Sequence, residues 1–336
     1  MRAVEDGRYW GAASGYSRAG TDDLLFFSFD ERGNMREECR FQIGGNPSFL
    51  CKDGDTLYAG LEMPDRAVVL SFLVTVDGGV KLEKTGELEV DASGLCHVSA
   101  GRHAVYGCCY KSGHVFAVDK ELRHVLWKEC PDRKQGISPH AHCGMETDDG
   151  RFLVEADLGM DGVYGFPLSD GRLAGDRVAL AKCPGAGPRQ VLYEKSMGQF
   201  IVVGEQGNTV AGYEWTCGDG QSQTAWIEKW SIRATNRPGT NYPGGAYSTE
   251  DGIIFWGNRG ADTIAAVKTG KTAAFLGEWA CRGSWPRSVL ASGRCVFAAC
   301  QKSGTLESFI WNGRMLEQSD CLKLEEAACV IAWQME

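Results

Sequence analysis

The sequence predicts an all-β fold, and three observations support this prediction. One strand–turn–strand pattern recurs seven times along the 336 residues at nearly constant spacing. The chain contains 44 glycines, an excess that indicates many turns. A strand that the first repeat lacks is found at the C-terminus, where it can complete that repeat. Together these observations predict one domain over residues 1–336, a seven-bladed β-propeller whose ring is closed by its C-terminal strand.

Each repeat begins with a glycine turn, which is followed by a short β-rich run, a polar turn and a second run of alternating apolar and polar residues. The successive intervals of 47, 47, 49, 48, 54 and 41 positions are typical of a four-stranded blade. We expect the longest insertions, Thr216–Gln223 and Arg233–Gly245, to form loops over one of the two faces. The repeats begin at Gly7, Gly54, Gly101, Gly150, Gly198, Gly252 and Gly293.

Another strand-like run precedes the glycine of every repeat except the first. These runs cover residues 46–53, 95–100, 139–149, 187–197, 242–251 and 285–292. The first repeat starts almost at the N-terminus, and the missing run is found as Ala327–Met335. We therefore expect this strand to complete the N-terminal blade and to remove the last open sheet edge. A β-sandwich or two barrels would leave this circular pattern unexplained.

The overall charge limits the classes of partner. The formal net charge is −9 and the pI is near 5.3, so we expect no broad basic surface for nucleic acid or an anionic membrane. An anionic ligand must therefore meet a local cluster of arginines. We expect a small-molecule partner, and a monomer or a weak homo-oligomer.

The N-terminus and the cysteines indicate a cytoplasmic protein. Residues 1–10 carry several charges and lack the apolar core of a secretory signal. No apolar run approaches the ~20 residues that span a bilayer. The absence of a C-x-x-C pair gives no support for a thiolate zinc site. We expect buried reduced thiols in the apolar strand-like runs, among them Cys108, Cys109, Cys295, Cys300 and Cys329.

Propeller geometry indicates where chemistry should be sought. The first strand of each blade is innermost, so the starts of these strands and the ends of the following strands meet around one mouth of the central channel. Polar side chains from four blades are predicted to lie at this mouth: His142, Arg189, Glu205, Arg259, Arg287 and Gln301.

Two histidines stand at the start of one innermost strand. His140 and His142 form an H-x-H pair whose side chains share one face of the strand, and such a pair can bind a metal. No third ligand accompanies them at suitable spacing, so we predict no metal site. His142 is the better candidate for a general base. His140 either contacts the substrate or bonds to neighbouring loops.

Two arginines start innermost strands that lie two blades apart, Arg189 after Pro188 and Arg287 after Pro286. A side chain in this position cannot reach the outer surface, so it needs an acidic partner or an anionic ligand. We predict a catalytic role for Arg189 and substrate binding for Arg287, with structural ion pairing as the alternative.

Polar residues also follow the second strands of the blades. Glu205 and Arg259 close two adjacent ones, where they can form an ion pair, and a carboxylate that orients an arginine is common in active sites. We predict catalytic roles for both. Tyr110 and Gln301 occupy matching turn positions, which the repeat alone can explain, and we predict that both contact the substrate.

Other motifs are absent or weak. Asp157, Gly159 and Asp161 lack the order of a calcium loop, so we expect a turn with side-chain caps. No G-x-S-x-G elbow, phosphate loop or dinucleotide motif is found. These absences argue against serine hydrolysis and nucleotide chemistry.

Residues 139–166, 185–193, 204–215 and 285–304 resemble, in this order, the lactonase family of seven-bladed propellers. The family includes propeller-type bacterial 6-phosphogluconolactonases and fungal carboxy-muconate lactonizing enzymes. The resemblance implies a cofactor-independent enzyme that acts on a lactone ring in the channel mouth. The family's proposed active-site residues would fall on His142, Arg189, Arg259 and Glu205. Two positions depart from the pattern: Gln190 replaces a frequent histidine and Gly204 a frequent asparagine.

The leading hypothesis is hydrolysis of an acidic sugar lactone, such as 6-phosphoglucono-δ-lactone, to its acid in carbohydrate metabolism through the pentose phosphate pathway. One enzymatic alternative is a muconate-type lactonizing enzyme. A non-catalytic binding platform is the alternative from another class, since fold does not imply function.

Overall fold

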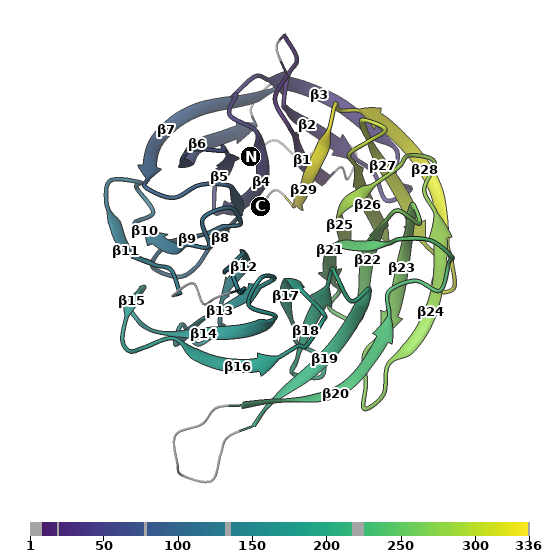
Figure 1. Ribbon diagram of the computed structural model, residues 1–336. Helices are drawn as coiled ribbons and strands as arrows, with labels where there is room; N and C mark the ends of the chain where they lie inside the picture. Colours follow the sequence, from purple (N-terminus) through teal and green to yellow (C-terminus); the bar gives the residue numbers. More distant parts are fainter. Residues whose placement is uncertain (1–8, 19, 77–78, 132–135, 217–224, 335–336) are drawn as a thin grey trace.

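The computed structural model describes residues 9–18, 20–76, 79–131, 136–216 and 225–334. Its strands form seven antiparallel sheets that are arranged as blades around a central channel (Figure 1). This arrangement confirms the predicted seven-bladed β-propeller. The part of the chain that the structure describes contains no helix long and apolar enough to cross a membrane.

The first strand of each blade lies innermost, as predicted (Figure 1). The innermost strands are β29 (Ala327–Trp333), β4 (Pro47–Asp53), β8 (Leu95–Ala100), β12 (Ala141–Glu146), β17 (Pro188–Glu194), β21 (Tyr242–Ser248) and β25 (Pro286–Ser292). The second strands are β1 (Tyr9–Gly15), β5 (Thr56–Glu62), β9 (Val105–Cys109), β13 (Phe152–Asp157), β18 (Gln199–Gly204), β22 (Ile253–Arg259) and β26 (Cys295–Cys300).

The third and fourth strands complete the blades toward the outside. The third strands are β2 (Leu24–Phe29), β6 (Ala67–Val76), β10 (Val115–Val118), β14 (Gly162–Ser169), β19 (Thr209–Thr216), β23 (Thr263–Lys268) and β27 (Thr305–Trp311). The outer strands are β3 (Met35–Phe41), β7 (Val80–Val90), β11 (Val125–Glu129), β16 (Val178–Lys182), β20 (Ala225–Arg233), β24 (Ala274–Ala280) and β28 (Leu316–Lys323). A short strand, β15 (Arg172–Leu173), adds to β14.

The C-terminal strand closes the ring. β29 pairs antiparallel with β1, with Trp10 opposite Trp333 and Ser14 opposite Cys329. The predicted completion of the N-terminal blade is therefore confirmed, with the strand ending at Trp333. Gly7 and Met335, the predicted ends of this blade, lie outside the described residues, as do residues 217–223 of one predicted insertion.

Among the described residues, the repeating glycines from Gly54 to Gly293 occupy the turns between the first and second strands of their blades. Gly150 and Gly198 adopt φ angles of 71° and 66°, in the left-handed region that favours glycine. These turns lie at the end of each blade opposite the predicted mouth. The repeat that is visible in the sequence is thus set by hairpin geometry, while the other end of each blade can vary in sequence.

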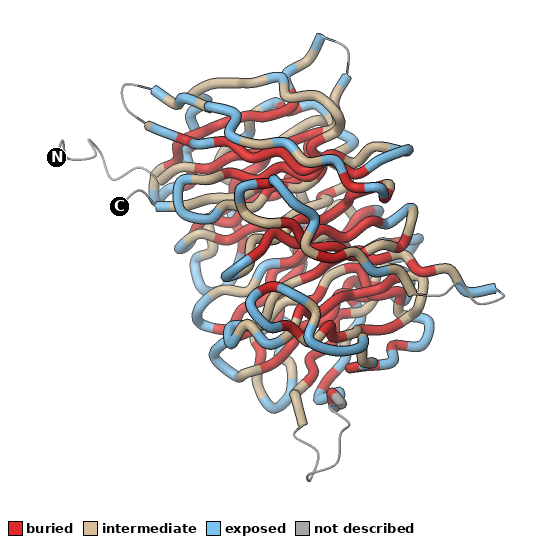
Figure 2. Tube along the Cα trace, turned by 90° about the vertical axis from the view of Figure 1, so that its left-hand side faces the viewer, coloured by how far each residue is buried: buried red, intermediate tan, exposed pale blue. Residues whose placement is uncertain are grey.

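Apolar side chains of neighbouring blades pack together and hold the ring closed. Phe27 and Phe29 of β2 contact Phe297 of β26, with centroids of Phe29 and Phe297 4.7 Å apart. Buried residues run through the stacked strands, while exposed residues concentrate on the loops (Figure 2). Burying one such side chain stabilises the fold by roughly 1.5–3 kcal/mol. The rim residues therefore rest on a closely packed core.

The cysteines are free thiols throughout the described residues. The five cysteines predicted to be buried thiols are all buried and free, as expected: Cys108, Cys109, Cys295, Cys300 and Cys329. Burial raises the pKa of the Cys108 thiol well above its ordinary value. These thiols therefore behave as small apolar groups in the core.

Candidate active site

A β-bulge occurs near the start of every innermost strand. In each blade the pairing with the second strand skips one position, or two in β21. Bulges redirect side chains, and each blade contributes at least one of these skipped residues to the lining of the central channel. The skipped positions are Ala328, Ser48, Cys96, His142, Arg189, Gly244–Gly245 and Arg287.

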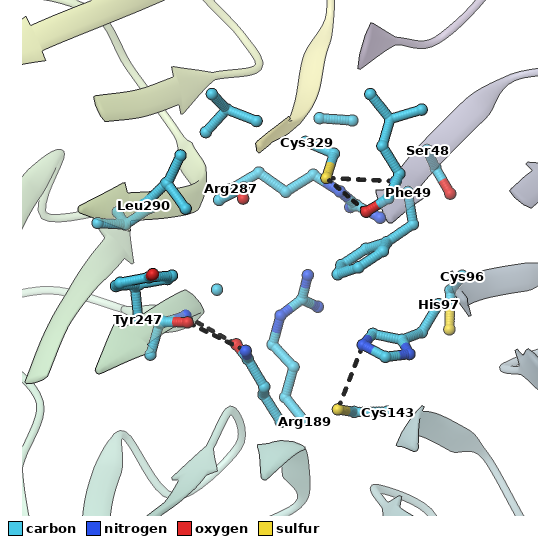
Figure 3. Close-up of a pocket in the computed structure, with 18 of the residues that line it drawn as sticks. Ser48, Phe49, Cys96, His97, Cys143, Arg189, Tyr247, Arg287, Leu290 and Cys329 are labelled. Atoms are coloured by element: carbon cyan, nitrogen blue, oxygen red, sulfur yellow. Dashed lines mark hydrogen bonds between the residues drawn. The ribbon is translucent and has the colours of Figure 1, made fainter. Parts of the chain in front are cut away.

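The channel encloses a cavity of about 200 Å³ beneath the mouth. Arg189 extends toward the middle of this space, and Arg287 enters it from another side (Figure 3). His97 and Phe49 pack against each other in the wall, with ring centroids 4.2 Å apart. The cavity therefore presents guanidinium groups within largely apolar walls, where a charge is only weakly screened.

Four of the predicted residues form one connected cluster. NH1 of Arg189 lies 2.7 Å from Nε2 of His142 and 2.8 Å from Oε2 of Glu205. NH2 of Arg259 lies 2.6 Å from the same Oε2. Arg259 also donates to the carbonyl oxygens of Tyr242, at 3.1 Å, and Pro243, at 3.0 Å. The structure thus brings together His142, Arg189, Glu205 and Arg259 from three adjacent blades.

The two arginines differ in how many of their donors are engaged. Arg259 uses Nε and NH2 on fixed partners and is buried, so its position is set by the protein. Arg189 uses only NH1 for hydrogen bonds to described residues. Its Nε and NH2 therefore remain available to a ligand in the cavity.

Burial and charge set the protonation states of the cluster. Burial and the Arg189 charge lower the pKa of His142 well below its ordinary value of 6.5, so the imidazole is neutral near pH 7. Burial would raise the pKa of Glu205, but Arg189 and Arg259 outweigh it and lower that pKa to about 2. Glu205 is therefore ionised at neutral pH.

The contact with Arg189 also determines the tautomer of His142. A guanidinium only donates, so Nε2 of His142 must accept. The imidazole proton is then carried by Nδ1, which lies 3.8 Å from Sγ of Cys96. In this state the lone pair of Nε2 is directed at the Arg189 guanidinium.

A second polar group lies on the same rim, and sequence reasoning found only one of its members. Arg287 lies 3.4 Å from Oε2 of Glu62 and over the ring of Tyr16, 5.3 Å from its centroid. The Tyr16 hydroxyl donates to the same Oε2 at 2.5 Å. Glu62 ends β5 and Tyr16 follows β1, positions that match Arg259 and Glu205 in other blades. This match in strand position is the sequence signal from which Glu62 and Tyr16 could have been predicted.

The remaining predicted residues border these groups. The Tyr110 ring stacks on His140 with centroids 4.6 Å apart and meets His142 edge-on at 5.6 Å. Gln301 is not part of the cluster. It lines a neighbouring hollow together with Trp285, whose ring lies 5.7 Å from the Arg259 guanidinium carbon.

The H-x-H pair is occupied by hydrogen bonds instead of forming a joint ligand set. Nδ1 of His140 donates to the Tyr110 carbonyl at 2.7 Å, while His142 accepts from Arg189. Asp157, from the calcium-like sequence, accepts backbone N–H bonds from His140, Gly159 and Met160. It therefore caps a turn, as predicted, and fixes the start of β12.

One other group of potential metal ligands is present among the described residues. Donor atoms of Cys281, Cys300 and Glu307 lie within 4.8 Å of one another. The Glu307 carboxylate already accepts backbone N–H bonds from Arg282 and Gly283. The Cys281 thiol and burial raise the pKa of Cys300, so this thiol stays protonated. These contacts explain the group as a support for the loop before β25.

Comparison with known proteins places this architecture in a family. A model of the seven-bladed β-propeller lactonase family matches residues 11–332. The protein belongs to this lactonase family. It is 26% identical to the 6-phosphogluconolactonase of Bacillus subtilis over 301 residues, which cover 84% of this chain and 85% of that protein.

Solved structures share the lactonase fold closely. A candidate 6-phosphogluconolactonase from Bacteroides fragilis superposes with a TM-score of 0.86 at 20% identity, covering 99% of this chain and 100% of that one. The periplasmic gluconolactonase of Pseudomonas aeruginosa gives a TM-score of 0.84 at 17% identity, covering 97% and 99%. At these identities the likeness establishes the fold.

Both departures from the lactonase pattern have structural explanations. The Gln190 carboxamide accepts from the Ala246 N–H at 2.7 Å and donates to its carbonyl at 3.0 Å. It thus joins the innermost strands of two blades. A Cβ at Gly204 would lie 2.4 Å from Oγ1 of Thr209 and 3.0 Å from the Ala186 carbonyl oxygen. An asparagine at position 204 would therefore require the Thr209 side chain and the loop that contains Ala186 to move.

The Gln190 contact leads to a stability prediction. Gln190→Ala removes both partners of the Ala246 backbone, and we expect the free energy of unfolding to fall by about 1–3 kcal/mol. Urea denaturation of the variant and of the wild type measures this change. Gln206→Ala, at an exposed position, is the control and is expected to change stability by less than about 0.5 kcal/mol. Equal losses in the two variants would contradict a bridging role.

Proposed function

We propose that this lactonase-family protein hydrolyses the lactone of an acidic sugar, with 6-phosphoglucono-δ-lactone as the leading substrate. The observation that carries the proposal is the buried cluster of His142, Arg189, Glu205 and Arg259 at the channel mouth. The 6-phosphogluconolactonase of Bacillus subtilis supports the same substrate class. The many reduced thiols favour action in the cytoplasm.

Arg189 is the residue that would bind the reacting part of the substrate. Its unengaged Nε and NH2 can form two parallel hydrogen bonds to an anionic group or to a carbonyl oxygen. Arg259 has fewer free donors and supplies a fixed positive charge close by. Glu205 would keep both guanidinium groups in place, because both bind its Oε2.

The proposed reaction is addition of water to the lactone carbonyl carbon. As the water oxygen bonds to carbon, negative charge develops on the carbonyl oxygen, and Arg189 and Arg259 stabilise it. The bond between this carbon and the ring oxygen then breaks, and the released alkoxide takes up the proton that His142 accepted from the water. His142 is proposed to accept the proton of the water once the substrate draws Arg189 away from Nε2.

The neutral state of His142 predicts the pH dependence of the reaction. The base is active when neutral, so activity is lost as pH falls through its pKa, which burial and Arg189 lower below 6.5. We expect kcat/KM to stay constant from about pH 6.5 to 8 and to decline only at lower pH. His142→Gln should remove this acid limb. If the fall of kcat/KM at low pH were centred above pH 6.5, this result would contradict the assignment of His142 as the general base.

The direct test is an assay of lactone opening by the purified protein at about pH 7, followed as acid release above the spontaneous rate. We expect the wild type to accelerate hydrolysis of 6-phosphoglucono-δ-lactone, and His142→Gln to lower kcat by about 10²–10⁴-fold. His103→Gln, at a half-exposed position, is the matched control and should retain activity. No acceleration of any lactone would overturn the proposal and favour a binding platform. Reaction of muconolactones alone would favour the lactonizing alternative.

A further inference from the structure

The group of Tyr16, Glu62 and Arg287 lies across the channel mouth from the proposed catalytic cluster. Tyr16 and Glu62 come from the first two blades and Arg287 from the seventh, whereas the cluster comes from the fourth to sixth. Arg287 and Arg189 line the same cavity, and the Arg287 charge lowers the pKa of both His142 and Arg259. The two groups therefore belong to one site with two sides.

The second group is arranged to offer a carboxylate oxygen to a ligand. Tyr16 and Arg287 both bind Oε2 of Glu62, and Oε1 takes no part in the hydrogen bonds found among the described residues. The Glu62 side chain is 25% exposed at the mouth, against 14% for Arg287. Burial raises the pKa of Tyr16, so its phenol remains protonated and continues to orient the carboxylate.

The charges of both sides together restrict the ligand. Arg189, Arg259 and Arg287 carry three positive charges against the two negative charges of Glu62 and Glu205, with His142 neutral. The excess of one positive charge suits a ligand with about one anionic group. A second carboxylate on the ligand would meet the Glu62 carboxylate and be repelled, whereas hydroxyl groups can donate to it.

We infer that Glu62, held by Tyr16 and Arg287, binds the hydroxyl-bearing part of the substrate and makes the site selective for polyhydroxylated lactones over lactones without hydroxyl groups. This inference rests on the proposed function and deepens it. It places the carbonyl of the ring near Arg189 and the sugar hydroxyls on the opposite side. Sugar lactones thereby become preferred over dicarboxylic muconate-type lactones.

The test compares lactones with and without hydroxyl groups. The kcat/KM for glucono-δ-lactone is divided by that for δ-valerolactone to give a selectivity ratio. Loss of one hydrogen bond to a charged group lowers binding about tenfold or more, so we expect Glu62→Gln and Tyr16→Phe each to lower the ratio by about tenfold to a hundredfold. An unchanged ratio in both variants would overturn the inference, as would a wild type that prefers δ-valerolactone.

The chain offers a matched control. The Tyr106 hydroxyl donates to Glu146 at 2.5 Å, the same contact as between Tyr16 and Glu62, but Glu146 lies at the far end of β12 from the mouth. Tyr106→Phe should therefore leave the selectivity ratio unchanged. If it lowers the ratio as much as Tyr16→Phe does, the effect comes from general loss of structure and the inference fails.

A binding measurement separates this inference from the proposed function. Calorimetric titration with D-gluconate, the acid formed from glucono-δ-lactone, needs no turnover. If the wild type opens no lactone but binds gluconate about tenfold or more tightly than Glu62→Gln does, the proposed hydrolysis fails and the inference stands. If the wild type neither opens a lactone nor binds gluconate, both fail.

Discussion

Replacement of Arg189 by alanine is expected to lower kcat/KM for 6-phosphoglucono-δ-lactone by about 10²–10³-fold, the usual cost of removing a donor that stabilises a developing oxyanion. The variant loses the only guanidinium of the cluster with free Nε and NH2 donors. Steady-state kinetics at about pH 7 measures the effect. Arg189→Lys should recover little activity, because an ammonium keeps the charge without the planar pair of donors.

The Arg189→Ala variant should also change the pKa of His142. Arg189 is one cause of the lowered pKa of His142, so its removal should raise that pKa, although burial still keeps it low. The decline of kcat/KM at low pH would then move to higher pH.

Arg177→Ala is a suitable control, since Arg177 pairs with the buried Glu155 and Asp157 and does not line the cavity. It should cost stability while leaving kcat/KM of the folded fraction unchanged. Equal losses of kcat/KM in the two variants would contradict the role of Arg189.

Replacement of Glu205 by glutamine is expected to lower the free energy of unfolding by about 3–5 kcal/mol at pH 7, because two buried guanidinium groups lose their shared counter-charge. Arg189 and Arg259 are 9% and 6% exposed and have no other carboxylate within the ion pairs found in the described residues. Urea denaturation measures the change. We also expect kcat/KM to fall by at least about 10²-fold, since Arg189 is no longer held.

The pH dependence of stability provides an independent check on Glu205. Its pKa is lowered from 4.5 to about 2 in the folded protein, so it contributes stability above pH 4.5 and loses this contribution as pH falls toward 2. The contribution is on the order of 3 kcal/mol. The difference in the free energy of unfolding between the wild type and Glu205→Gln should therefore become smaller as the pH falls from 4.5 toward 2. Glu87→Gln, at an exposed ion pair, should show neither effect, and a constant difference for Glu205→Gln would refute the linkage.

The fold could be predicted because its determinants are local and repeated. Gly150 and Gly198 show the same hairpin turn at nearly the same interval, with the left-handed backbone that glycine favours. Ala327–Trp333 could be recognised as the closing strand because a ring of blades leaves one strand to be supplied by the other terminus.

The placement of residues on the rim followed from the same repeat. Strand order alone brings the start of each innermost strand close to the end of the second strand, so His142, Arg189, Glu205 and Arg259 could be assigned to one mouth. The pattern could not show that Gln301 lies in a separate hollow beside Trp285. That difference depends on how the loop before β25 packs against its neighbours.

The sequence by itself determined the sevenfold ring, its closure and the set of polar residues at one mouth, because these depend on turn chemistry and strand period. Only the tertiary structure decided which atoms meet. The bulges redirect His142 and Arg189 into the channel, and rotamers select the single oxygen of Glu205 that both arginines share. Glu62 and Arg287, 225 positions apart, become partners only because ring closure places their blades near each other.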